Sequence, residues 1–313
     1  MWSATDGLGE QMSIVVVGSV ALDSVQTPSG CVEEELGGSA SYFSLAASLY
    51  GEVRLLAVVG DDFPARHVHC LRERGIDLSG LQVAEGRTFR WKGCYEGDLN
   101  TAITLDTQLN VFSQFHPTLP EACREPSCLF LANIDPDLQL EVLSQIGGAG
   151  LTAADTMDFW IQRKKDSLTR VFCRVDMVVI NEAEAKEYAD TRNVVAAARG
   201  ILALGPKAVV VKRGEYGCAL FTDSGYFVAP AYPLEHVQDP TGAGDTFAGG
   251  LIGYLAQAGE ASPAVVRRAI LHGSAVASFA VEDFGVRRLL TLSGSEVVAR
   301  CRELREFTYL EGI

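Results

Sequence analysis

The chain has 313 residues, of which 48% are hydrophobic and 21% are charged. This apolar fraction excludes a disordered chain, which could not bury enough surface to offset its ordering entropy. The formal net charge of −14 disfavours nucleic acids and anionic membranes as main partners. No apolar run approaches the roughly 20 residues of a membrane span, and the first residues lack a signal-peptide pattern. We therefore expect a cytoplasmic protein whose eight cysteines are free thiols.

Short β-branched runs alternate with helical patterns along most of the chain, which predicts parallel strands joined by helical crossovers. Strands are predicted at 13–20, 53–59, 128–134, 150–156, 175–180 and 207–214, with a hairpin at 218–229. Helices are predicted at 39–50, before Gly75, after Pro136, from Asn181, after Gly244, and at 263–281. This order indicates an α/β fold.

The segment 86–115 interrupts this rhythm. TFRWKGCYEGDLNTAITL alternates in polarity and is rich in Thr and aromatic residues, which is typical of antiparallel hairpins. We interpret 1–313 as one domain with a small β lid drawn mainly from about 86–115. Such a flap can close over a site or supply an edge for dimerisation, and a decorative insertion is the alternative.

The strongest chemical signal is DPTGAGDTFAGGLIGYLA at 239–256. Gly242, Ala243 and Gly244 carry almost no side chain, so their amides can close around an anion where a helix begins. Asp245 is the first acid after this loop and can accept a proton from a group beside that anion. Such an arrangement suits phosphoryl transfer. The alternative is that Asp245 only caps the helix.

This string resembles the C-terminal signature of the ribokinase family, the PfkB carbohydrate kinases, and other motifs follow in that family's order along most of the chain. GSVALD at 18–23 resembles the family's first strand with its substrate-binding aspartate, here Asp23. Gly37 and Gly38 resemble the di-glycine that packs near the sugar. The resemblance implies a ribokinase-like three-layer α/β/α sandwich with a mostly parallel central sheet and a small β-sheet lid.

By this resemblance, the protein is expected to transfer the γ-phosphate of ATP to a hydroxyl of a small sugar, sugar acid or nucleoside. Asp245 is then the general base beside the acceptor, and the amides of Gly242, Ala243 and Gly244 form the anion hole.

The resemblance also implies residues that hold Mg²⁺ and the nucleotide. Asn181 and Glu184 resemble the family's N-x-x-E motif for magnesium and phosphate, and Glu184 is expected to act through water. Lys212, with Gly214 and Gly217, resembles the K-x-G-x-x-G stretch near the nucleotide phosphates.

Three more residues follow from the resemblance. Thr241 is expected to contact phosphate. His272 falls near the place where the family often has an adenine-contacting Asn or His, with a packed helix histidine as the alternative. Asp239 matches an acid that helps to hold a monovalent cation in potassium-responsive relatives, so we also expect activation by K⁺.

The chain departs from the family on the acceptor side. Many relatives have a sugar-binding Asn a few residues after the di-glycine, where this chain has Ser41 and Tyr42. This change argues against ribose and fructose as acceptors. Arg90 in the lid segment is expected to meet the acceptor, with a solvent-facing position as the alternative. A lid of exposed strands also predicts a homodimer formed lid to lid.

Two functions of other classes share parts of this pattern. A catalytically silent sensor would use the same cleft, but it would not need a base and metal-binding groups together. A dinucleotide-dependent oxidoreductase would share the α/β alternation, but no G-x-G-x-x-G follows the first strand.

Overall fold

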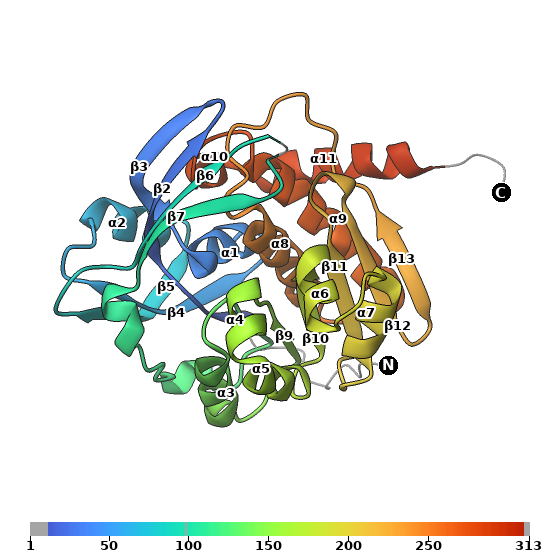
Figure 1. The fold of residues 1–313 in the computed structure, drawn as a ribbon, viewed down its shortest axis with the longest axis horizontal. Coiled ribbons are helices and arrows are strands. Elements are labelled where there is room, and N and C mark those ends of the chain that lie inside the picture. Colours follow the sequence, from blue (N-terminus) through green and yellow to red (C-terminus); the bar gives the residue numbers. More distant parts are fainter. Residues whose placement is uncertain (1–11, 98, 310–313) are drawn as a thin grey trace.

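The computed structural model describes residues 12–97 and 99–309, which form two β-sheets and the helices around them (Figure 1). Within these residues the larger sheet has nine strands, in the order β13 (Gly225–Ala229), β12 (Cys218–Thr222), β11 (Ala208–Lys212), β10 (Met177–Asn181), β9 (Leu151–Ala154), β8 (Cys128–Leu131), β1 (Ser13–Val17), β4 (Glu52–Gly60) and β5 (Ile76–Ala84). The strands from β11 to β5 are parallel, β12 runs antiparallel to β11, and β13 runs antiparallel to β12 and so in the direction of the main strands. The mostly parallel sheet is therefore confirmed.

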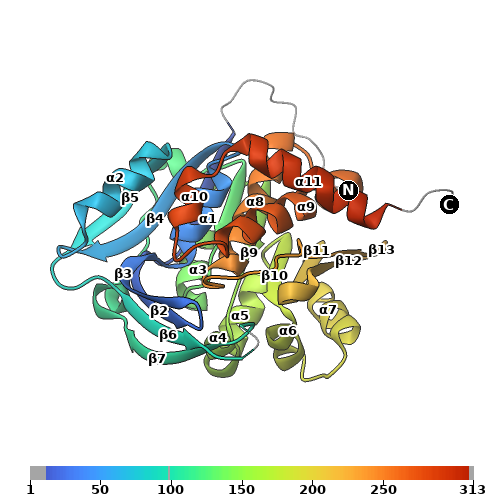
Figure 2. The same ribbon diagram turned by 90° about the horizontal axis from the view of Figure 1, so that it is seen from above.

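Helices cover both faces of this sheet (Figure 2). One face carries α1 (Ser39–Ala47), α2 (Ala65–Glu73), α8 (Ala243–Ala258), α9 (Pro263–Ala280), α10 (Arg287–Thr291) and α11 (Gly294–Thr308). The other carries α3 (Pro136–Gln145), α4 (Asp158–Arg163), α5 (Lys165–Phe172), α6 (Glu182–Tyr188) and α7 (Val194–Leu202). Alternate residues of β1 supply the two cores, with Ile14 and Val16 in the first and Val15 and Val17 in the second. This confirms the three-layer α/β/α sandwich.

The smaller sheet is the lid. Its strands lie in the order β3 (Gly30–Gly37), β2 (Ala21–Thr27), β6 (Arg90–Tyr95) and β7 (Ala102–Gln108). The expected lid range, 86–115, supplies β6 and β7 with the short helix η1 (Asn110–Gln114), whereas β2 and β3 come from 21–37, so that range does not supply most of the lid. A bulge between Asp23 and Val25 shifts the pairing of β2 and β3, and an acidic run fills β3, which hides both strands in the sequence.

Several elements have no counterpart among the predicted ones: β5, α4, α5, α7, α10, α11 and the short helix η2 (Glu121–Cys123). All eight cysteines are free thiols, as predicted. Among the residues that the structure describes, no helix is both long and apolar enough to cross a membrane.

Candidate active site

The two glycine motifs of the sequence meet where α1 and α8 pack against each other. A Cβ atom at Gly249 of α8 would lie 2.4 Å from the carbonyl oxygen of Phe43 in α1. A Cβ at Gly253 would lie 2.6 Å from the ring of Tyr50, just beyond the end of α1. Only glycine permits so close an approach, and this contact brings the N-terminus of α8 beside the N-terminus of α1.

Gly242 is the N-cap of α8 and has a left-handed backbone conformation with φ of 72°. A Cβ here would lie 2.4 Å from ring atoms of Tyr42, so the backbone of the loop rests directly on this buried ring. The amide of Ala243 donates to the carbonyl of Pro240 at 3.2 Å. The loop thus forms a turn at the positive end of the α8 dipole, as an anion-binding loop requires.

Asp245 lies half-buried in the first turn of α8. Burial, together with the negative charge of Asp155, raises its pKa from 3.8 to about 7, and the charge of Lys212 partly offsets this rise. The carboxyl is therefore poised between its two protonation states near neutral pH, as suits a general base.

Asp23 in β2 lies beside the di-glycine. Its Oδ2 atom accepts a hydrogen bond of 3.4 Å from the amide of Gly38, and it fills the space that a side chain at Gly37 would occupy, only 1.9 Å from a Cβ there. Burial raises the pKa of Asp23 to about 7, and the charges of Asp239 and Asp245 add to this effect. The structure thus brings the GSVALD motif and the di-glycine together with Asp245.

Asp239 braces the loop before α8. Its carboxylate is buried and accepts two backbone hydrogen bonds, from Thr241 at 2.9 Å and from Gly285 at 3.0 Å. The Thr241 hydroxyl donates to the hydroxyl of Tyr95 in β6 at 3.2 Å. Thr241 therefore ties the lid to the loop before α8, a contact that the sequence did not reveal.

Asn181 and Glu184 form a capping box at the start of α6. The Asn181 side chain accepts from the Glu184 amide at 2.8 Å, and Glu184 Oε2 accepts from the Asn181 amide at 2.9 Å. Burial raises the pKa of Glu184, and the charge of Lys212 opposes that rise. In 12–97 and 99–309, no group of three or more His, Cys, Asp or Glu side chains is placed to hold a metal. The motif thus offers one carboxylate, Glu184, for a metal ion.

Lys212 ends β11 and pairs with Asp155, which follows β9. Their Nζ and Oδ2 atoms are 2.6 Å apart. A Cβ at Gly244 would lie 3.1 Å from the same Nζ, so the ammonium lies against the first turn of α8. Sequence analysis placed Lys212 near the phosphates but missed Asp155. The available signal was its position at the carboxyl end of a predicted parallel strand, where ligands bind in open α/β sheets.

Gly214 and Gly217 bound the short helix η3 (Gly214–Tyr216) between β11 and β12, and both have positive φ. A Cβ at Gly217 would lie 2.1 Å from the carbonyl oxygen of Ala229. The loop that joins β6 and β7 reaches this turn, since Asn100 donates to the carboxylate of Glu215 at 3.1 Å. The lid therefore contacts the main sheet at the predicted nucleotide side.

His272 of α9 is held by aromatic side chains. Its Nδ1 lies 3.0 Å from the hydroxyl of Tyr50, and its ring stacks on Tyr254 at a centroid distance of 4.1 Å. Tyr50 lies beyond the C-terminal end of α1, whereas the site gathers at the N-terminal end. Burial lowers the pKa of His272 to about 4. These contacts are those of a packed helix histidine.

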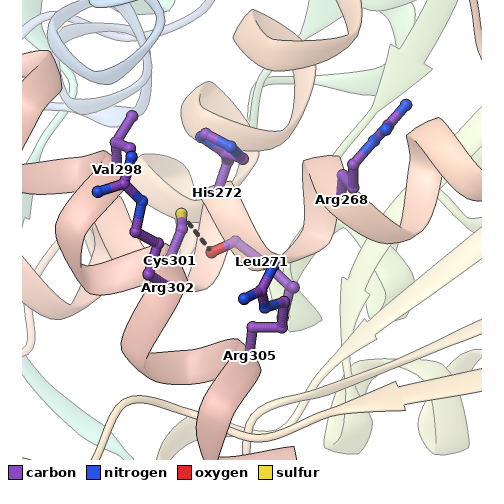
Figure 3. A pocket seen from close by; sticks show the side chains of 7 residues that line it. All are labelled: Arg268, Leu271, His272, Val298, Cys301, Arg302 and Arg305. Carbon is purple, nitrogen blue, oxygen red and sulfur yellow. Dashed lines mark hydrogen bonds between the residues drawn. The ribbon is translucent and has the colours of Figure 1, made fainter. Parts of the chain in front are cut away.

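His272 also lines a cleft of about 210 Å³ between α9 and α11 (Figure 3). Arg268, Arg302 and Arg305 surround this cleft, and their guanidinium groups point in different directions. The Cys301 thiol donates to the carbonyl of Leu271 at 3.7 Å. The arginines therefore do not converge on one point, as an anion site would need.

Arg90 and Ser41, which were both predicted to bind the acceptor, differ in their contacts. Arg90 forms ion pairs with Glu34 at 2.7 Å and Asp62 at 2.8 Å, so it joins the lid to the loop after β4. Ser41 is fully buried, and its hydroxyl has no hydrogen-bond partner. The Tyr42 hydroxyl is likewise buried without a hydrogen-bond partner. Burial raises its pKa, and the negative charge of Asp23 adds to this rise.

A carboxylate at the glycine-rich start of a helix, beside a β lid, is an arrangement expected of a small-molecule kinase. Residues 11–291 match the model of the pfkB family carbohydrate kinases, and the chain belongs to this family.

Similar proteins include nucleoside kinases. The chain is 31% identical over 250 residues to the cytidine kinase of Thermococcus kodakarensis, and the match covers 78% of this chain and 88% of that protein. The nucleoside kinase of Burkholderia thailandensis, solved with inosine, has a TM-score of 0.75 at 21% identity and covers 95% of this chain and 99% of its own. A protein from E. coli solved with ATP and Mg²⁺ has a TM-score of 0.77 at 19% identity, covering 93% and 99%.

We predict that Gly242→Ala destabilises the protein by about 2 kcal/mol or more, because it combines left-handed strain with a clash against Tyr42. Urea unfolding measures the change. The matched control is Gly294→Ala at the start of α11, where a Cβ meets no atom within 4 Å. Equal stability of the two variants would contradict the tight contact.

We predict that Asp23→Asn alters the pH dependence of stability. The folded pKa of about 7 lies above the unfolded value near 4, so the folded state binds this proton more tightly. The stability that Asp23 contributes is present below pH 4 and is lost as the pH rises to about 7. The variant should therefore gain free energy of unfolding relative to wild type between pH 5 and pH 8. If the difference in free energy of unfolding between variant and wild type is the same at pH 5 and pH 8, the raised pKa of Asp23 is refuted.

Proposed function

We propose that this protein is an ATP- and Mg²⁺-dependent kinase that phosphorylates a hydroxyl of a nucleoside, with cytidine as the first candidate. The observation that carries the proposal is the position of Asp245 in the glycine-rich first turn of α8, with the Lys212 ammonium beside it. The likeness to a cytidine kinase at 31% identity supports the nucleoside class. Replacement of the expected sugar-binding Asn by Ser41 and Tyr42 agrees with an acceptor other than free ribose.

In this mechanism Asp245 accepts the proton of the acceptor hydroxyl as that oxygen attacks the γ-phosphorus of ATP. The bond to the β–γ bridging oxygen breaks, and ADP leaves. The amides at the start of α8 and the Lys212 ammonium stabilise the negative charge on the transferring group. Asp23 accepts a hydrogen bond from the acceptor and so orients it toward Asp245.

Glu184 fits the role of an indirect Mg²⁺ ligand. Its Oε2 serves the capping box, which leaves Oε1 for a water of the ion, and Mg²⁺ usually keeps several waters beside one or two carboxylates. Asn181 fixes this carboxylate through the same capping box. Bound Mg²⁺ would supply positive charge that neutralises the phosphates. The role of Asp239 in holding a monovalent cation stays a prediction, as do activation by K⁺ and the cytoplasmic location.

We predict that the protein releases ADP from ATP when cytidine is present and that Asp245→Asn lowers kcat by about 10²–10⁴-fold, because Asn cannot accept the proton. A coupled assay of ADP release measures both, with ribose and 2-keto-3-deoxygluconate as competing acceptors.

The matched control is Asp223→Asn, which alters an exposed carboxylate on the β12–β13 turn and should leave kcat unchanged. Binding of cytidine without ADP release would favour the sensor alternative. An Asp245→Asn variant that keeps more than about a tenth of the wild-type kcat would overturn the base assignment, since Asn cannot accept the proton of the acceptor hydroxyl.

We also propose that two copies associate through their lids. Every residue of β7 is exposed, including Ile103 and Leu105 on one edge of the lid sheet. Exposed apolar side chains on an edge strand favour pairing with another chain. Light scattering should give twice the mass of one chain, and Leu105→Asp should halve it. A monomeric wild type would refute this association.

A further inference from the structure

Lys212 has an unusual position among the charges of the site. Its ammonium faces three carboxylates, those of Asp155, Glu184 and Asp245. It pairs with Asp155 at 2.6 Å, although β10 separates the strand that ends at Lys212 from the strand that precedes Asp155. The side chain of Lys212 therefore reaches across the end of β10. Of its three acidic neighbours, the one it contacts is the one with no assigned part in the reaction.

Asp155 is held rigidly. Only 2% of it is exposed, and its second oxygen, Oδ1, accepts from the amide of Thr156 at 2.8 Å. The buried side chain of Gln139 donates to the carbonyl of Asp155 at 3.0 Å and to that of Ala132 at 3.0 Å. The backbone of Asp155 is thus tied to the end of β8, and its carboxylate has a fixed direction.

The pairing determines where the ammonium lies. A Cβ at Gly244 would be 3.1 Å from Nζ, so the charge of Lys212 lies at the positive end of the α8 dipole. Two positive features at one point repel each other unless an anion balances them. In this structure, Asp155 supplies this balance. A phosphoryl group at the start of α8 would then meet a positive charge that is already in place.

We propose that Asp155 is a positioning residue, which holds the Lys212 ammonium at the start of α8 and keeps it away from Asp245 and Glu184. The long lysine stem has several rotatable bonds, and a fixed partner removes this freedom before the substrate binds. Without Asp155, Lys212 would pair with Asp245 or Glu184. The first pairing would block the base, and the second would block the carboxylate proposed to hold Mg²⁺ through water. This inference rests on the proposed function.

The test is a double-mutant cycle with Asp155→Asn, Lys212→Met and the double variant, measured for kcat, for the KM of ATP and of cytidine, and for ADP binding by calorimetry. Asp155→Asn should lower kcat at least tenfold and weaken ADP binding severalfold, with the KM of cytidine within twofold of wild type. Because Asp155 acts through Lys212, the double variant should be no worse than Lys212→Met alone. Asp155→Glu, which keeps the charge, should recover part of kcat.

The matched control is Asp176→Asn, which removes the acid from the Lys207–Asp176 ion pair at the opposite end of the parallel strands. Its kinetics should equal those of wild type. If Asp155→Asn does not fold, the comparison of Lys212→Met with the double variant tests the inference instead. The double variant removes both partners of the buried ion pair, so neither partner is left without the other. The inference would be overturned if the loss of kcat in the double variant equalled the product of the losses in the two single variants. An Asp155→Asn variant with wild-type kcat and ADP affinity would also overturn it. A wild type without ADP release would instead refute the proposed function, and the calorimetry would still test the positioning of Lys212.

Discussion

The close contact of α8 with α1 is the constraint on which the rest of the site depends. Three glycines of the α8 segment, at 242, 249 and 253, face the ring of Tyr42, the carbonyl of Phe43 and the ring of Tyr50. Side chains at these positions would push the helices apart, because protein interiors have no free space to accommodate them. The contact places the di-glycine at the start of α1, together with Asp23 of β2 beside it, next to Asp245 at the start of α8. The two halves of the proposed reaction, acceptor and phosphate, therefore meet at one place.

This placement has a cost in charge. Asp23 and Asp245 are crowded into a low-dielectric region with Asp239 nearby, and burial raises the pKa values of both to about 7. The protein would have a higher free energy of unfolding at neutral pH without these acids. The groups that titrate near pH 7 are therefore present at a cost in stability. The positive end of α8 and the Lys212 ammonium offset part of the repulsion. The same positive field is what a phosphoryl group would use.

The sequence predicted the parts of the protein that depend on local patterns. β-branched runs predicted most of the parallel strands, and the string at 239–256 predicted the loop that places Gly242 and Asp245 at the start of α8. Contacts between distant segments were harder to predict. The strands β2 and β3 were missed because a bulge and an acidic run break their alternation, and Asp155 was missed because its partner lies 57 positions away. His272 followed from sequence position alone, whereas packing against Tyr50 and Tyr254 determines where it lies.

The central claim is that the contact of α1 with α8 places an acceptor hydroxyl beside Asp245. A crystal structure of the protein with cytidine and a non-hydrolysable ATP analogue measures this directly, as the distance from the Asp245 carboxylate to the nearest ribose hydroxyl. The account predicts a distance of about 2.6–3.2 Å, with the γ-phosphate at the amides of Gly242 and Gly244. A nucleoside bound elsewhere, or a ribose hydroxyl that contacts a proton-accepting side chain other than Asp245, would contradict it.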